Sequence, residues 1–210
     1  MDNTTLPQEL SSSIGSEKME FAVKAGRAQP LKKSLSLIVF GTLWTTFASV
    51  CGVAFFGPLL SGEEVHFKLN GVSTIANINN LGSILMPSIV TGIFILIGLV
   101  MLSSGIYFIF KKGGYFVGTP ERLVQFQNGT LRSMDWEQFS GDIEVSGNPQ
   151  NGDISLQMRT GRLVHRKHGP DRFVPDIIYI SEIPNVFGVE QICRKRIKEN
   201  DPTPSVKSAP

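Results

Sequence analysis

Residues 35–56 read LSLIVFGTLWTTFASVCGVAFF, and residues 88–110 read SIVTGIFILIGLVMLSSGIYFIF. Neither stretch contains a charged residue. A helix that crosses the hydrocarbon core of a bilayer needs about 20 apolar residues, and both stretches are long enough. They therefore predict two transmembrane helices, over residues 35–60 and 88–110. Pro58 is expected to help end the first helix, and Pro87 to begin the second.

The distribution of lysine and arginine predicts the orientation of these helices. The loop between them, residues 61–87, contains one basic residue, Lys68. The basic residues on the outer sides are Lys24, Arg27, Lys32, Lys33, Lys111 and Lys112. The positive-inside rule then places the loop outside and both termini in the cytoplasm. We expect a multi-pass protein of the cytoplasmic membrane, with a polar cytoplasmic segment over residues 1–34.

Small residues recur in both apolar stretches. Side chains of this size let helix backbones approach closely, so we expect Gly41, Thr45 and Gly52 to pack against Ser88 and Gly92. Packing between copies of the chain, in a homo-oligomer, is the alternative use of these residues. No ionisable residue lies within either stretch, which argues against transport by a single subunit.

The loop between the two stretches contains a β-hairpin pattern. Residues 64–69 (EVHFKL) alternate between polar and apolar, and residues 72–76 (VSTIA) follow an Asn-Gly pair. An Asn-Gly pair between such runs predicts a hairpin. Because an isolated hairpin is only marginally stable in water, we expect this one to pack on the membrane surface or on a partner.

A β-rich domain is predicted after the second helix, over residues 112–199. Short strand patterns occur at residues 115–118, 122–127, 130–136, 142–146, 153–158, 161–166 and 176–180. Apolar residues then recur at helical spacing between residues 185 and 199. This order predicts a small antiparallel barrel or sandwich capped by a C-terminal helix. Residues 200–210 are rich in proline and serine, which predicts a disordered tail.

Three short motifs carry a resemblance to a known family. They are residues 115–123 (YFVGTPERL), 152–154 (GDI) and 180–186 (ISEIPNV). The region 112–199 resembles the pleckstrin-homology-like (PH-like) domains of prokaryotic membrane proteins. The resemblance implies a small PH-like barrel closed by one helix, which would follow the membrane helical hairpin predicted from the two apolar stretches. It also implies the cytoplasmic membrane of a prokaryote as the location.

The sequence contains no convincing catalytic set. A glycine-rich phosphate loop and a Gly-x-Ser-x-Gly motif are both absent. His165 and His168 lie near Asp171, but nearby cations oppose metal binding and further ligands would be needed. The net charge of +2 is too small to suggest a nucleic-acid partner. We expect no cofactor, no bound metal and no enzymatic activity.

A basic cluster is the most suggestive feature for function. Its members are Arg159, Arg162, Arg166, Lys167 and Arg172. Beside an anionic membrane surface, each such cation contributes about 1 kcal/mol of attraction. An ordinary solvated loop is the simpler interpretation of the same residues.

Three functional hypotheses follow. The first is a membrane-anchored binding or scaffold protein that presents a PH-like domain at the cytoplasmic face to a protein partner or to further copies of itself. The second is a sensor of anionic lipid headgroups that uses the basic cluster. A membrane-bound enzyme is the third and the least supported hypothesis.

Overall fold

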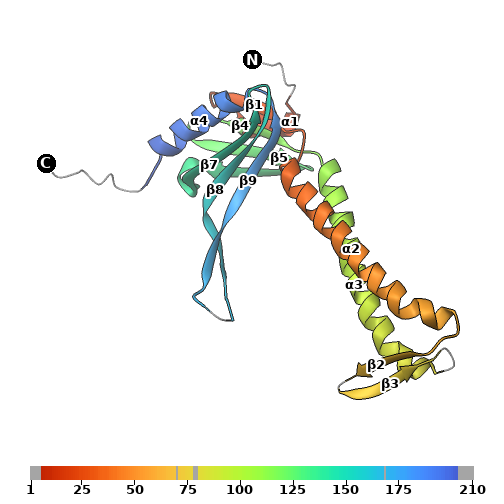
Figure 1. Cartoon of the computed structure of the whole chain (residues 1–210). Coiled ribbons are helices and arrows are strands. Elements are labelled where there is room, and N and C mark those ends of the chain that lie inside the picture. The colour runs from red at the N-terminus through yellow and green to blue at the C-terminus, as the bar shows by residue number, and fades with distance from the viewer. Residues whose placement is uncertain (1–5, 70, 78–79, 168, 203–210) are drawn as a thin grey trace. The chain divides into compact units, whose positions relative to one another are not determined.

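The computed structural model describes residues 6–69, 71–77, 80–167 and 169–202. The chain folds into two compact units. We call residues Leu31–Ile109 the hairpin unit. We call the other the sheet unit, because it contains most of the strands (Figure 1). It combines Met1–Pro30 with Phe110–Pro210, so it is formed by sequence on both sides of the hairpin unit.

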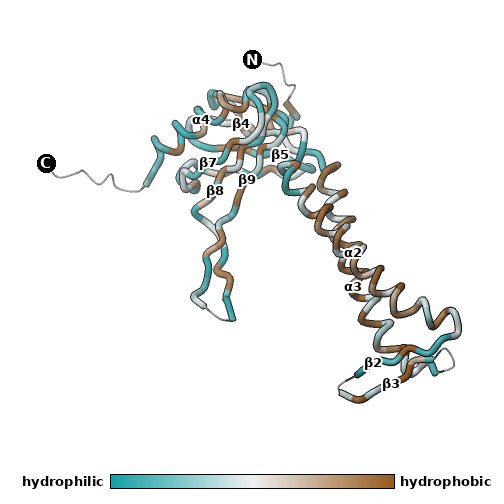
Figure 2. The backbone as a smooth tube through the Cα atoms, viewed as in Figure 1, coloured by the Kyte–Doolittle hydropathy of each residue, from teal (hydrophilic) through white to brown (hydrophobic). Residues whose placement is uncertain are grey.

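Two helices dominate the hairpin unit, α2 (Leu31–Leu60) and α3 (Leu81–Phe110). Both are long and apolar enough to cross a membrane, as predicted, and brown apolar residues run along both in Figure 2. Side chains such as Leu43 and Val53 point outward and are exposed, which suits contact with lipid.

Both helices extend further than the sequence patterns predicted. The second begins at Leu81 and contains Pro87 in its interior, and the first contains Pro58 before its end at Leu60. The expectation that Pro87 begins the second helix was therefore wrong, whereas the first helix ends at Leu60, two residues after Pro58. Side-chain hydroxyls accommodate proline in such helices by bonding to backbone carbonyls. Next to Pro87, the Ser88 hydroxyl donates to the Ile84 carbonyl oxygen at 2.8 Å.

The predicted hairpin between the helices is confirmed. Strands β2 (Val65–Leu69) and β3 (Val72–Ala76) pair antiparallel, and Gly71 takes a left-handed conformation at the turn. Asn70 lies outside the described residues. The Phe67 ring packs edge-on against Phe55 of α2, with 5.4 Å between ring centroids. The hairpin therefore packs on a helix of its own unit.

The first sheet of the sheet unit has four antiparallel strands in the order β1-β4-β5-β6. They are β1 (Phe21–Lys24), β4 (Tyr115–Gly118), β5 (Arg122–Gln127) and β6 (Thr130–Asp135). Strand β1 precedes the hairpin unit in sequence and pairs with β4, which follows it. The N-terminal segment, expected to be a separate polar stretch, thus supplies an edge strand of this sheet.

The second sheet has the order β7-β8-β9 and is also antiparallel. Its strands are β7 (Phe139–Asn148), β8 (Asn151–Val164) and β9 (Arg172–Ile183). A short 3-10 helix, η1 (Trp136–Gln138), joins the two sheets. The described strands of the sheet unit form these two sheets and no closed barrel. The two strands predicted at 153–158 and 161–166 are one strand, β8, because the register shifts between Gln157 and Gly161 without a turn.

The main core of the sheet unit is covered by α4 (Val186–Glu199), the predicted C-terminal helix. Four apolar residues of α4 are buried there, Val186, Val189, Cys193 and Ile197. Trp136 is fully buried in the same core, and its indole N–H donates to the Thr119 carbonyl oxygen at 2.8 Å.

A second, smaller core is formed by the N-terminal helix α1 (Gln8–Ile14). Its buried residues Leu10 and Ile14 pack on Val117 of β4 and Val124 of β5. These two valines alternate with residues of the main core, so they belong to the opposite face of the first sheet. The sequence before α2 therefore contributes both a strand and a covering helix to the sheet unit.

Candidate functional site

Strands β8 and β9 continue well beyond the core of the sheet unit (Figure 1). At the end of the core, the outermost buried residues are Met158 on β8 and Ile178 on β9. From there each strand runs on for six residues, 159–164 and 172–177. At about 3.3 Å per residue this extension is about 20 Å long. We call residues 159–177 the arm.

The arm is held together by cross-strand pairing. Leu163 lies directly opposite Phe173, and Gly161 lies opposite Pro175. A Cβ atom on Gly161 would lie 2.7 Å from Cζ of Phe173, so the ring occupies the space above the glycine. The aromatic ring covers backbone that the glycine would otherwise leave open to water.

One face of the arm is apolar. Directly opposite residues of an antiparallel pair share a face, so Leu163 and Phe173 lie together. Leu163 is 63% exposed and Phe173 is 50% exposed. Gly161 and Pro175 belong to the same face and add no polar side chain. Two large apolar side chains therefore stand next to each other in water.

The opposite face and the tip of the arm carry the positive charge. Arg162 lies opposite Val174, and Arg172 lies opposite Val164. The tip adds Arg166 and Lys167, both exposed. Among the described residues, these four cations form no ion pair with a carboxylate. The carboxylate nearest in sequence, Asp171, bonds instead to Nδ1 of His165 at 2.8 Å.

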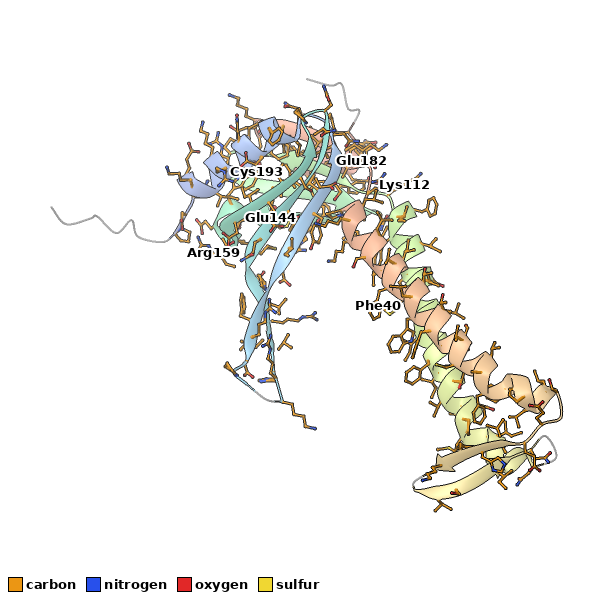
Figure 3. All side chains as sticks on the ribbon, in the orientation of Figure 1. Phe40, Lys112, Glu144, Arg159, Glu182 and Cys193 are labelled. Carbon is orange, nitrogen blue, oxygen red and sulfur yellow. The ribbon has the colours of Figure 1, made fainter. Side chains whose placement is uncertain are left out.

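Arg159, the fifth member of the predicted basic cluster, lies apart from the other four. It is located where the arm leaves the sheet (Figure 3). Its Nε atom donates to the Phe139 carbonyl oxygen at 3.0 Å, and its Nη2 atom donates to Asp201 at 2.7 Å. Arg159 thus fastens the start of the C-terminal tail to the base of the arm, and most of that tail, 203–210, lies outside the described residues.

The described residues offer no cluster for a metal. Among them, no group of three or more His, Cys, Asp or Glu side chains lies close enough to hold an ion. His168, considered above together with His165, is outside the described residues.

Three ion pairs that the sequence patterns did not reveal hold the N-terminal segment to the sheet unit. Their members are Glu17 with Arg122 of β5, Glu20 with Arg196 of α4, and Arg27 with Glu182 of β9. The hydrogen bond from Arg122 lowers the pKa of the Glu17 carboxyl, and that from Arg196 lowers the pKa of Glu20. Both carboxylates are therefore charged in neutral solution and fasten the segment at separate points.

Within the hairpin unit, the predicted small residues fall into two groups. Gly41 lies where the helices are in close contact, because a Cβ atom there would be 2.9 Å from the Leu102 backbone nitrogen. A Cβ atom on Gly52 would lie 3.2 Å from the Thr91 methyl carbon, and the Thr45 side chain contacts Gly98 of α3. Gly98 and Gly105, which also belong to the recurring small residues of the second stretch, face α2 as well, since a Cβ atom on Gly105 would lie 3.1 Å from the Ile38 backbone nitrogen.

The other two predicted packing residues, Ser88 and Gly92, take a different position. A Cβ atom on Gly92 would meet no atom of the neighbouring helix within 4 Å. Ser88 and Gly92 line a shallow apolar groove of about 520 Å³ on the hairpin unit, together with Gly52 and Val53. Gly92 therefore does not bring the helices together.

Comparison with known proteins identified no relative of this chain. The chain matches no protein-family model, no curated protein and no solved structure. Within the described part of the sheet unit, the arm combines an exposed apolar pair with four exposed cations.

Proposed function

We propose that this protein is a membrane-anchored binding protein of the cytoplasmic membrane. In this proposal the two long helices span the bilayer, and the sheet unit is a PH-like domain on the cytoplasmic side. The arm is its recognition surface. The pairing of β1 with β4 is the observation that carries the proposal.

This pairing constrains how the chain crosses the membrane. Strand β1 precedes the two helices and β4 follows them, yet Lys24 lies directly opposite Tyr115. The pairing continues to the Ala28 N–H, which donates to the Lys111 carbonyl oxygen at 3.0 Å. Strands on opposite sides of a hydrocarbon core about 30 Å thick could not pair in this way. Both flanks then lie on one side, and their lysines and arginines favour the cytoplasm.

The plan of the sheet unit supports the PH-like assignment. A four-stranded and a three-stranded antiparallel sheet are followed by one C-terminal helix that covers the core between them. The motif residues Thr119 and Arg122 form one corner, where the Thr119 N–H donates to the Arg122 carbonyl oxygen at 2.9 Å. In this version of the plan, the first strand is separated from the others by the membrane helices.

The chemistry of the arm indicates what it binds. Exposed apolar side chains that lie together, with cations beside them, form a surface that suits binding. A partner for this surface has to supply negative charge and apolar surface together. A protein partner, a second copy of this chain and a lipid surface are the three classes that the arm could meet at a membrane.

The orientation is tested with single cysteines and a membrane-impermeant maleimide. In a chain with Cys51→Ala and Cys193→Ala, the new cysteines are Ser11→Cys and Gln150→Cys in the sheet unit and Ser73→Cys in the loop. We expect Ser73→Cys to react in intact cells and the other two to react only in inverted vesicles. Labelling of Ser11→Cys and Gln150→Cys from opposite sides would contradict the proposal.

The role of the arm is tested by site-specific photo-crosslinking in native membranes. A photoreactive amino acid replaces Phe173 in one chain and Gln150, in the turn between β7 and β8, in the control. We expect a crosslinked product from position 173 and none from position 150. Equal crosslinking from both positions would show that the arm is not a specific binding surface.

A further inference from the structure

We propose that the arm docks on the surface of an anionic lipid bilayer. Leu163 and Phe173 enter the interfacial layer, while Arg162, Arg166, Lys167 and Arg172 contact the headgroups. The inference rests on the proposed function, because it needs the sheet unit to be held beside a membrane. It selects one class of partner for the arm.

The apolar face of the arm has the properties needed to enter a bilayer. Leu163 and Phe173 are paired across the two strands, and the neighbouring positions on their face, Gly161 and Pro175, bring no polar side chain. The antiparallel ladder between β8 and β9 pairs only the inward-facing backbone groups of the arm, because β7 accompanies β8 no further than Met158. Open strand edges are not stable in the hydrocarbon core. The backbone of the arm therefore stays in the hydrated headgroup layer, and only the two large side chains of this face reach the apolar boundary.

The charges of the arm fit an anionic surface. Besides Arg159, which is paired with Asp201, the arm contains four cations, all between residues 162 and 172. Its two carboxylates are Asp171, which bonds to His165, and Asp176, which accepts a hydrogen bond from the Thr160 hydroxyl at 3.1 Å. Arginine and lysine side chains extend along apolar surface and keep their charged ends at the headgroups. At physiological ionic strength their attraction extends over only about 8 Å, so they act when the tip of the arm reaches the surface.

The anchoring of the chain favours lipid over the other two classes. The two candidate spans keep the arm near a bilayer, so even a weak contact forms at high effective concentration. A protein partner would have to provide a groove for two apolar side chains with acidic groups around it. A second copy of the arm would bring four further cations against these four, which opposes pairing of arm with arm.

The experiment uses the full chain in lipid nanodiscs. An environment-sensitive fluorophore is attached to Leu163→Cys in a Cys51→Ala, Cys193→Ala background, and quenching by spin-labelled lipid reports contact with the bilayer. One set of discs contains only phosphatidylcholine, and the other also contains phosphatidylglycerol. We expect the fluorophore to be quenched at least fivefold more strongly in the anionic discs.

Matched variants separate the arm from general electrostatic attraction. Arg162, Arg166 and Lys167→Gln together should abolish the difference between the two kinds of disc. Arg194, Lys195 and Lys198→Gln, an equal loss of charge on α4, should preserve it. Phe173→Ser should weaken quenching in the anionic discs with the charges intact. A loss of the difference in both triple variants would overturn the inference.

Two other results would also overturn the inference. A fluorophore that stays in water in both kinds of disc would exclude insertion. Shielding of the fluorophore in native membranes but not in lipid-only discs would assign the arm to a protein partner. In either case correct maleimide labelling of the sheet unit and the loop would leave the proposed orientation standing. If the labelling fails, the proposed function itself fails, whatever the discs show.

Discussion

At the scale of a single residue, the core of the sheet unit changes the ionisation of the Cys193 thiol. Cys193 lies on α4 (Figure 3). Its side chain is on the buried face of this helix, in the same core as Val189 and Ile197. Burial raises the pKa of the Cys193 thiol to about 12, because a thiolate would lose its hydration there. The thiol therefore stays protonated in the folded protein at pH values where it ionises in the unfolded chain.

This difference predicts a pH dependence of stability. The pKa is higher in the folded state than its ordinary value of 9.0, so the contribution of Cys193 is complete below pH 9 and is lost as the pH rises towards 12. Relative to Cys193→Ala, the wild-type chain should lose about 1 kcal/mol of unfolding free energy per pH unit above about pH 9.

The measurement is urea unfolding followed by the fluorescence of Trp136. Both chains carry Trp44→Phe and Cys51→Ala, so that one indole in the sheet unit reports the transition. A stability difference between the two chains that stays constant from pH 7 to pH 10.5 would contradict a buried thiol. Lysines and tyrosines titrate in both chains alike, and their effect cancels in the comparison.

At the same scale, sequence alone could not separate Arg159 from Arg162. Both are arginines of one basic cluster and lie on one strand, β8. They differ because Asp201, 42 residues after Arg159, accepts its hydrogen bond. A partner this distant in sequence leaves no local pattern. The four cations of the arm, by contrast, are exposed in the structure, as expected of a polar stretch that is rich in charge.

At the scale of elements, the contact between α2 and α3 depends on which glycine faces the neighbouring helix. A Cβ atom on Gly98 would lie 3.1 Å from Cδ1 of Trp44 and 3.2 Å from Cα of Thr45. Trp44 is itself fixed to α3, because its indole N–H donates to the Phe94 carbonyl oxygen at 2.9 Å. There is no room for a larger side chain at position 98.

We therefore predict that Gly98→Val destabilises the hairpin unit by about 1–3 kcal/mol, the usual cost of overpacking. Gly92→Val is the matched control, since it places the same side chain on the same helix where no atom of the neighbouring helix lies within 4 Å. The thermal loss of helical circular dichroism in detergent measures both variants. Equal melting temperatures would show that the helices do not meet at Gly98.

Elements with local patterns were the ones that the sequence predicted. The charge-free stretches predicted α2 and α3, and the alternating patterns at residues 122–127 and 130–136 predicted β5 and β6. The turn between these strands consists of Asn128 and Gly129, both left-handed in the structure. Strand β1 was missed because it has only four residues, inside a segment that is mostly polar. Its partner β4 begins at Tyr115, so the pairing depends on contacts that no short window of sequence contains.

At the scale of the molecule, the sheet unit is one structure made from two separated pieces of sequence. Phe21 and Val23 of β1 are buried in the main core with residues of β4, β5 and α4. Burying two such side chains stabilises the unit by about 4 kcal/mol. The piece before the helices is therefore required for the fold of the piece after them.

This arrangement predicts that the membrane helices can be removed without loss of the sheet unit. The backbones of Arg27 and Lys112 form an antiparallel β-bridge, and the Ala28 N–H donates to the Lys111 carbonyl oxygen at 3.0 Å. The two cut ends therefore already lie side by side. Replacing residues 29–110 with Asn-Gly converts β1 and β4 into an ordinary hairpin. We expect this chain to be soluble and to unfold in one cooperative transition in urea.

Residues 111–202 alone, without β1 and α1, are the control and should lose that transition, because the apolar residues that β1 and α1 cover become exposed. A control that unfolds as cooperatively as the joined chain would mean that β1 adds nothing to the domain, and the constraint on sidedness drawn from its pairing would fail with it.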